Sequence, residues 1–257
     1  MKNIHYLFFA ILVYSSLSFA QLKPWKYMDG NQVFNGFSIK PSKKSPQKPG
    51  ILILPAWMGI DKLSKDTAGN LAKMGYYAFV ADIYGEGNYP KDYKEAGPNA
   101  GFYKTNFKDY QKRIALALEQ LIRSGANPDN IVVIGYCFGG TGALEAARGH
   151  LNVKGVVSFH GELGKDPTRP TEPINAKVLV CHGADDPYES KEEITAFQQE
   201  MRDTKSDWQM IYYANAVHSF TNPESGNDNS KGAAYNEKAA RRSWEHLKLF
   251  LNEVLKK

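Results

Sequence analysis

The sequence contains little cysteine and no concentrated charge. Its 257 residues include only two cysteines, Cys137 and Cys181, too few for the disulfide framework of a small secreted domain. The 32 Lys and Arg residues against 27 Asp and Glu residues give a formal net charge of +5, which is spread along the chain. Because there is no basic block and no basic stripe interleaved with aromatic residues, we expect no nucleic-acid partner.

Metal and phosphate motifs are also missing. The histidines and cysteines show no ligand spacing such as Cys-x-x-Cys or His-Glu-x-x-His, so the sequence predicts no metal site. The glycines in 85–87 lack the strand-to-helix frame Gly-x-Gly-x-x-Gly of a phosphate-binding loop. The two cysteines also lack the spacing that thiol redox proteins generally need.

The first twenty residues have the pattern of an export signal. Lys2 is followed by a short apolar run at 7–13, and Ser18 and Ala20 place small residues where a signal peptidase acts. The alternative, a membrane anchor, would need about 20 predominantly apolar residues, and this run is far shorter. We therefore expect a signal peptide at 1–20, cleavage before Gln21, and a periplasmic or secreted protein that is not membrane-bound after removal of the signal.

Residues 21–257 are predicted to form a single α/β domain. Short apolar runs alternate with amphipathic stretches, the pattern of a mostly parallel central sheet with helices on both faces. One or two antiparallel edge strands are expected within 26–40. The other expected strands are 51–54, 77–80, 131–134, 156–159, 178–180 and 208–212, and the expected helices lie near 63–74, 105–124, 139–149, 189–203 and 232–255.

The most informative segment is Gly-Tyr-Cys-Phe-Gly-Gly at 135–140, directly after one predicted strand and before a helix. This is the setting of a nucleophile elbow, with Cys137 in the place where serine is usual. The glycines allow a sharp turn, and the following helix N-terminus favours a thiolate. The alternative is a buried, inert cysteine; the context favours a catalytic Cys137.

An acid and a base follow in the chain order of this fold. Two aspartates compete at the end of the strand 178–180, and we expect Asp186, just before a proline, to act and Asp185 to be a turn or capping residue. His218, after the strand 208–212, is the expected base. His160, at the end of the strand 156–159, is a weaker candidate for a substrate contact.

A disulfide between Cys137 and Cys181 is the simplest expectation for an exported protein. Both cysteines, however, lie near the ends of predicted strands that the strand 156–159 is expected to separate. Non-neighbouring strands exceed the usual Cα reach of a disulfide. We therefore expect two free thiols.

The chain resembles the dienelactone hydrolase family through the motif at 135–140, His-Gly-Ala-Asp-Asp-Pro at 182–187 and Val-His-Ser-Phe-Thr-Asn-Pro at 217–223. The resemblance implies an α/β-hydrolase fold, no cofactor, and a thiol nucleophile that acts on small esters or lactones. It matches Cys137, Asp186 and His218 to the catalytic triad. It also matches the backbone N–H groups of Trp57 and Phe138 to the oxyanion hole.

One position departs from that family. Ala56 stands where the dienelactone-cleaving members have a glutamate that interacts with the nucleophile, so dienelactone itself is a doubtful substrate. The expected function is hydrolysis of a small ester or lactone through a thioester intermediate. The alternatives are a non-catalytic hydrolase-fold binding module and a thiol redox protein that uses both cysteines.

Overall fold

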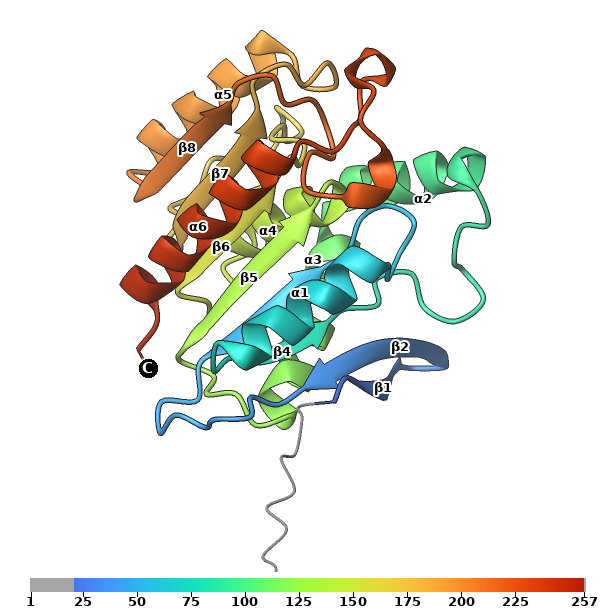
Figure 1. The fold of residues 1–257 in the computed structure, drawn as a ribbon, viewed down its shortest axis with the longest axis vertical. Coiled ribbons are helices and arrows are strands. Elements are labelled where there is room, and N and C mark those ends of the chain that lie inside the picture. Colours follow the sequence, from blue (N-terminus) through green and yellow to red (C-terminus); the bar gives the residue numbers. More distant parts are fainter. Residues whose placement is uncertain (1–20, 257) are drawn as a thin grey trace, which may run out of the picture.

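The computed structural model describes residues 21–256 (Figure 1). The predicted signal peptide, 1–20, lies outside the described residues. Within the described part, no helix combines the length and apolar character of a membrane span.

An eight-stranded sheet runs through the molecule in the order β1-β2-β4-β3-β5-β6-β7-β8. Strands β1 and β2 pair antiparallel, and β2 joins β4 in the same sense, whereas every other neighbouring pair is parallel. The predicted parallel sheet with antiparallel edge strands is confirmed. The strands are β1 (Lys23–Asp29), β2 (Gln32–Ile39), β3 (Gly50–Leu54), β4 (Tyr77–Val80), β5 (Ile131–Tyr136), β6 (Gly155–Phe159), β7 (Lys177–Gly183) and β8 (Trp208–Tyr213).

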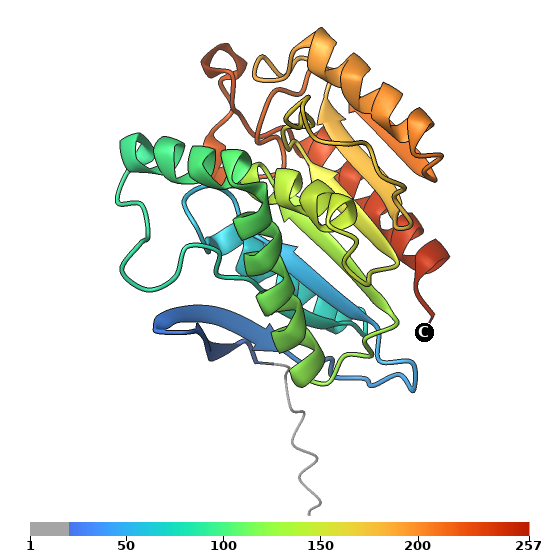
Figure 2. The same cartoon turned by 180° about the vertical axis from the view of Figure 1, so that it is seen from behind.

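Helices cover both faces of this sheet. Figure 1 shows α1 and α6 in front of it, and Figure 2, from behind, shows α3, α4 and α5 on the opposite face. The helices are α1 (Lys62–Lys73), α2 (Tyr93–Thr105), α3 (Phe107–Arg123), α4 (Phe138–Arg148), α5 (Lys191–Asp203) and α6 (Glu237–Val254), with short 3₁₀ turns η1 (Pro223–Ser225) and η2 (Asn229–Lys231).

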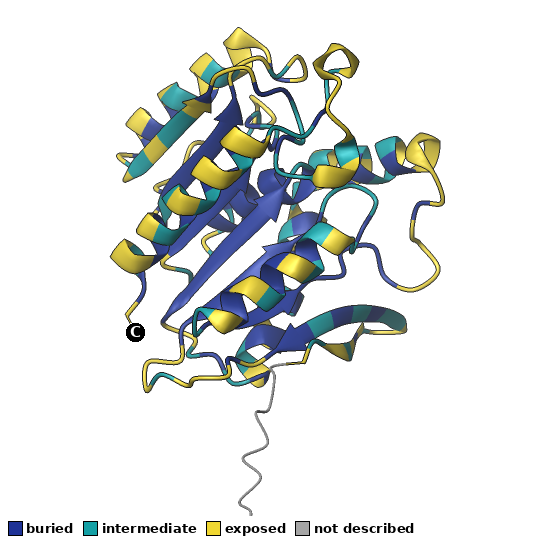
Figure 3. Ribbon diagram, viewed as in Figure 1, coloured by how far each residue is buried: buried dark blue, intermediate teal, exposed yellow. Residues whose placement is uncertain are grey.

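The continuous apolar runs of the central strands follow from this two-sided cover. In β3, Leu52 and Leu54 pack into the core under α3 and α4, while Ile51 and Ile53 pack into the core under α1 and α6. Since successive side chains point to opposite faces, both sets are buried only if both faces are covered. Figure 3 shows the resulting pattern, with buried central strands and helices exposed on their outer sides.

One helix was not predicted. The helix expected near 105–124 is confirmed as α3, and a further helix, α2, precedes it and meets it at Asn106. The segment of α2 contains Gly97, Pro98 and Gly101, which have poor helix propensity, and this hid the element. A local signal was present, since the Asp92 side chain caps the helix by accepting from the N–H groups of Lys94 and Glu95.

The parallel strands place several chemically useful residues at one edge. Cys137 follows β5, His160 follows β6, and Asp186 follows the end of β7 by three residues. Open α/β sheets bind their ligands outside the carboxyl ends of the strands. The candidate site is therefore at this edge.

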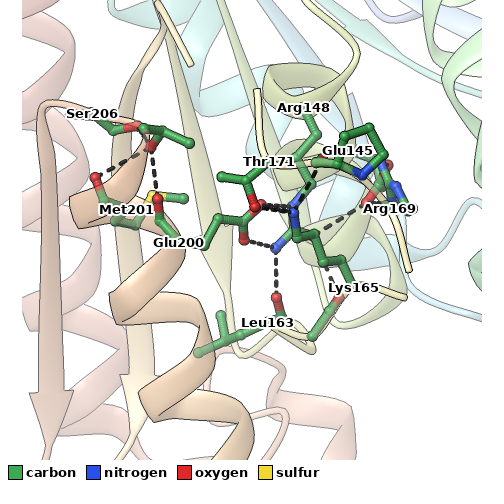
Figure 4. A network of polar contacts seen from close by, with 12 residues as sticks. Glu145, Arg148, Leu163, Lys165, Arg169, Thr171, Glu200, Met201 and Ser206 are labelled. Carbon is green, nitrogen blue, oxygen red and sulfur yellow. Dashed lines mark hydrogen bonds and ion pairs between the residues drawn. The ribbon is translucent and has the colours of Figure 1, made fainter. Parts of the chain in front are cut away.

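A buried ion network holds α4 in place from its far end. The Arg148 guanidinium donates to both carboxylate oxygens of Glu200 on α5, at 3.1 and 2.7 Å, and to the carbonyl oxygen of Leu163 at 2.7 Å. Glu145 on the same helix accepts from Arg148 and Arg169 (Figure 4). Removing one partner would leave an uncompensated buried charge, so this network fixes the helix that carries Cys137 at its start.

Candidate active site

Cys137 occupies a sharp turn between β5 and α4. Its φ of +53° and ψ of −120° lie outside the regions that residues with side chains ordinarily adopt. Two glycines permit the turn: a Cβ on Gly135 would lie 1.8 Å from the carbonyl oxygen of Gly139, and a Cβ on Gly139 would lie 2.1 Å from that of Leu54. The predicted strand-turn-helix setting of this cysteine is confirmed.

The backbone around Cys137 is held by hydrogen bonds on both sides. Its N–H donates to the carbonyl oxygen of Phe159 at 3.0 Å, and its carbonyl accepts from the N–H groups of Gly140 and Thr141. The residue is half-buried and is the N-cap of α4. The thiol therefore lies at the positive end of a helix dipole.

The structure brings His218 and Asp186 together. The Nδ1 of His218 lies 2.9 Å from Oδ2 of Asp186, whose side chain is only 3% exposed. The other carboxylate oxygen, Oδ1, accepts from the backbone N–H of Tyr188 at 3.0 Å. Asp185, the competing aspartate, is exposed, and its backbone N–H donates to the carbonyl of Ala216. Of the two aspartates, Asp186 is therefore the one placed to orient the imidazole.

The loop that follows His218 returns to form hydrogen bonds with its backbone. The N–H of His218 donates to the carbonyl of Gly232 at 3.1 Å, and its own carbonyl accepts from the N–H of Ala234 at 3.0 Å. The Tyr188 ring also packs edge-on against the imidazole, with centroids 5.4 Å apart. The backbone of His218 is thus fixed by these hydrogen bonds, and its ring is packed against Tyr188.

The electrostatics of His218 place it beside Cys137. Burial alone would lower the pKa of His218, but hydrogen bonds to the Asp186 carboxylate and to the Cys137 thiolate, with the charges of both groups, raise it to about 10. A histidine with that pKa is an imidazolium at neutral pH. The neighbours of His218 therefore favour its charged form.

The two residues matched to the oxyanion hole are linked by Tyr84. Its hydroxyl donates to the carbonyl of Trp57 at 2.7 Å, and its ring stacks on Phe138 with centroids 5.8 Å apart. Phe138 also stacks with Tyr110, whose hydroxyl donates to the Phe138 carbonyl at 2.9 Å. As the first residue of α4, Phe138 has an N–H with no partner inside the helix. The sequence interpretation missed Tyr84, because its role depends on contacts between distant segments.

The side chain of His160 is too deeply buried to contact a substrate. It is 1% exposed and lies beneath the elbow, where Nδ1 accepts from the Cys137 N–H at 3.2 Å. The interpretation of His160 as a substrate contact is therefore wrong, since a residue buried to this extent has no surface to offer a ligand.

The second cysteine is buried, and its thiol is difficult to ionise. Cys181 and Cys137 are both free, and β6 separates their strands as expected. Cys181 is fully buried, and that burial raises the pKa of its thiol to about 12. A dithiol redox role for the two cysteines has no support in this arrangement.

The described residues form no cluster that meets the requirements of a metal site. Among residues 21–256 there is no group of three or more His, Cys, Asp or Glu side chains that could hold a metal ion. A cavity of about 570 Å³ lies between β8 and α6, away from Cys137, and another of about 470 Å³ borders Tyr84 and Tyr103. Neither is lined by Cys137, Asp186 or His218, so the site is located by the geometry of these three side chains and not by cavity size.

Known proteins resemble the chain over most of its length. The pattern of the dienelactone hydrolase family matches residues 34–255. The solved structure named m3DLH is 32% identical, covers 93% of this chain and 100% of its own, and superposes with a TM-score of 0.86. A dienelactone hydrolase-like promiscuous phosphotriesterase from metagenomic libraries is 32% identical, with 92% and 99% coverage and a TM-score of 0.85.

A sequence relative gives the same indication. A probable 2-oxo-3-(5-oxofuran-2-ylidene)propanoate lactonase from Bradyrhizobium sp. is 26% identical over 213 residues, which is 79% of this chain and 83% of the relative. The solved neighbours confirm the expected α/β-hydrolase fold.

Proposed function

The chain belongs to the dienelactone hydrolase family, and we propose that it hydrolyses small carboxylic esters or lactones through a triad of Cys137, His218 and Asp186. One observation carries the proposal: the Asp186 carboxylate binds Nδ1 of His218 at 2.9 Å, and Cys137 is among the groups that raise the pKa of the same imidazole. A nucleophile, a base and an orienting acid within hydrogen-bond reach are the signature of acyl transfer.

The first half of the reaction acylates the enzyme. The Cys137 sulfur attacks the substrate carbonyl carbon, and the carbonyl oxygen becomes an oxyanion that the N–H groups of Phe138 and Trp57 stabilise. As the intermediate collapses, the carbon–oxygen bond to the leaving group breaks and the His218 imidazolium gives that oxygen its proton. A thioester and an alcohol result; in a lactone the alcohol stays attached to the acyl group.

The second half releases the acid. Neutral His218 now removes a proton from water, the resulting hydroxide attacks the thioester carbonyl, and the carbon–sulfur bond breaks. The thiolate and imidazolium are thereby restored. Asp186 keeps the proton of the imidazole on Nδ1 in its neutral form and stabilises the cation in its charged form.

Ala56 narrows the choice of substrate. Ala56 lies in the turn that follows β3. The two residues before it, Leu54 and Pro55, have carbonyl oxygens that lie close to Gly139 at the start of α4. An alanine there supplies no charge near the thiol, so the nucleophile is available without gating by a carboxylate. We accordingly favour simple esters and lactones over dienelactone.

The experiment is a substrate panel tested on the full chain and on Cys137→Ala. Aryl esters, aliphatic esters, lactones and a phosphotriester are compared at equal concentration, the last because a similar enzyme is named for that activity. We expect turnover of at least one ester or lactone by the native protein and none by the variant. Binding of these compounds without turnover would support the alternative, a non-catalytic binding module.

Export is a separate part of the proposal. Lys2, the apolar run at 7–13 and Ala20 support removal of residues 1–20. The N-terminal sequence of the protein recovered from periplasm and medium tests it, with Gln21 as the expected first residue. Recovery with Met1 intact, from the cells alone, would contradict it.

A further inference from the structure

A buried histidine connects the nucleophile to the loop of the base. His160 has a φ of +39°, an unusual conformation for a residue with a side chain, and its N–H donates to the carbonyl of Cys181 at 2.9 Å. One ring nitrogen, Nδ1, faces the N–H of Cys137 at 3.2 Å, and the other, Nε2, lies 2.7 Å from Oγ1 of Thr221. Strained residues persist where their surroundings fix them, often at functional sites.

The partners of His160 determine its tautomer. The backbone N–H of Cys137 is always a donor, so Nδ1 must be the acceptor and carries no proton. The proton of the neutral ring is therefore on Nε2, which donates to the Thr221 hydroxyl. The same N–H of Cys137 also donates to the carbonyl of Phe159 at 3.0 Å. It therefore has two acceptors, and His160 is the second.

We propose that His160 and Thr221 form a positioning pair, which keeps the elbow of Cys137 and the loop of His218 in one relative arrangement. The proposal rests on the proposed function, because it assumes that these two residues react together. Thr221 is three residues beyond His218, and the His160 ring packs edge-on against both His218 and Phe220 at 5.2 Å. The pair thus spans the two segments that must meet for proton transfer.

The pair works only while His160 is neutral. A proton on Nδ1 would remove the acceptor of the Cys137 N–H and place a cation beside the imidazolium of His218. The groups that face His160 are Cys137, His218, Tyr136 and, farther away, His182. Burial, and then the charge of His218, lower the pKa of His160 well below its usual value. The neutral ring is therefore maintained throughout the neutral pH range.

Thr221→Val tests the pair with little change of shape, and Thr221→Ser is its matched control because it keeps the hydroxyl. For a simple aryl ester, we expect Thr221→Val to lower kcat roughly 10- to 100-fold with KM within about twofold, the size produced by small misplacements of reacting groups. Thr221→Ser should recover most of that loss. In ¹⁵N-histidine NMR spectra of the native protein, His160 should be in the Nε2–H form from pH 6 to 8, and its N–H resonance should be lost or shifted in Thr221→Val.

Three results would overturn the proposal: an Nδ1–H or doubly protonated His160 in the native spectra, an unchanged kcat in Thr221→Val, or an equal loss in Thr221→Ser. The spectra do not depend on activity. If Cys137→Ala keeps full activity, the proposed function fails; if it is inactive while Thr221→Val turns over normally, only the positioning pair fails.

Discussion

Replacement of Asp186 by asparagine tests how the base is oriented. In the native protein, Oδ1 of Asp186 accepts from the Tyr188 N–H at 3.0 Å and Oδ2 accepts from His218 at 2.9 Å. An asparagine would keep its oxygen toward the backbone donor and turn its NH₂ group toward Nδ1 of His218. Nδ1 must then become an acceptor, and the ring proton moves to Nε2, which can no longer take the proton of the Cys137 thiol.

The size of the rate loss distinguishes a wrong imidazole tautomer from the loss of one hydrogen bond. A charged hydrogen bond is worth about 1.5–3 kcal/mol, so its loss alone would lower the rate by roughly 10- to 150-fold. A wrong tautomer costs on the order of 10⁴ in kcat, the effect known for amidation of a triad aspartate. We therefore expect a loss of about 10⁴ in Asp186→Asn and a loss within about twofold in Asp185→Asn, whose side chain is exposed.

The pH dependence gives a second readout of the same change. Hydrogen bonds to Asp186 and Cys137 outweigh the effect of burial and raise the pKa of His218 to about 10, above its unfolded value of about 6.5. Such a group adds stability that is fully present below its unfolded pKa and is lost as the pH rises through its folded pKa. The melting temperature of the native protein should therefore exceed that of Asp186→Asn by more at pH 6 than above pH 10.

The assay is stopped-flow hydrolysis of an aryl ester, with the melting temperature measured across the same pH range. A loss of only 10- to 150-fold would refute the tautomer argument and reduce Asp186 to a hydrogen-bond partner. A larger loss in Asp185→Asn would refute the assignment of the acid altogether.

Three further predictions concern residues around the triad. Tyr84→Phe keeps the ring stack but removes the hydrogen bond to the Trp57 carbonyl, so kcat/KM should fall by roughly 2- to 13-fold, the value of one such bond, in the same ester assay. Burial raises the pKa of Glu189 to about 8, so the folded protein loses stability as the pH rises from about 4.5 to 8 and a charge is favoured on this buried group. Glu189→Gln should therefore raise the melting temperature at pH 8 by at least about 2–4 °C, and by less at pH 5. Ala56→Glu should slow iodoacetamide labelling of the elbow thiolate at neutral pH, because a like charge disfavours the thiolate.

Each of these changes has a matched control. Tyr103→Phe removes a neighbouring hydroxyl that donates to Ile83 instead, and an equal loss of kcat/KM there would remove the special role of Tyr84. Glu192→Gln alters an exposed carboxylate on the same segment as Glu189, and an equal gain in stability would make burial irrelevant. Ala56→Gln has the size of glutamate without its charge; if it slows labelling as much, the effect is steric.

Local patterns in the sequence were sufficient for the sheet and the elbow. The buried strands read as apolar runs because both sheet faces are covered. The turn at Cys137 requires glycine at Gly135 because a Cβ there would meet the nearby Gly139, whereas the need for glycine at Gly139 comes from the distant Leu54. Helix α2 was missed because its glycines and proline oppose helix formation locally, and its Asp92 cap and tertiary packing outweigh that preference.

The supporting residues could not be predicted in the same way. Tyr84 contacts Trp57 across 27 positions, and His160 contacts Thr221 across 61. Such contacts depend on how strands and loops meet in space, and neither residue lies in a pattern that specifies its partner. The choice of Asp186 over Asp185 was made from its position directly before Pro187, and the structure supplies the contact with His218.

The most direct test of the central claim is to trap the acyl group on the enzyme. The full chain is mixed with an activated aryl acetate, quenched in acid within the first turnover, digested and analysed by mass spectrometry, with Cys137→Ala treated in parallel. We predict an acetyl group on the peptide that contains Cys137 in the native protein, and no acetylated peptide in the variant. Rapid turnover by the native protein with an acetyl group on another residue, or continued turnover by Cys137→Ala, would contradict a thioester mechanism at this site.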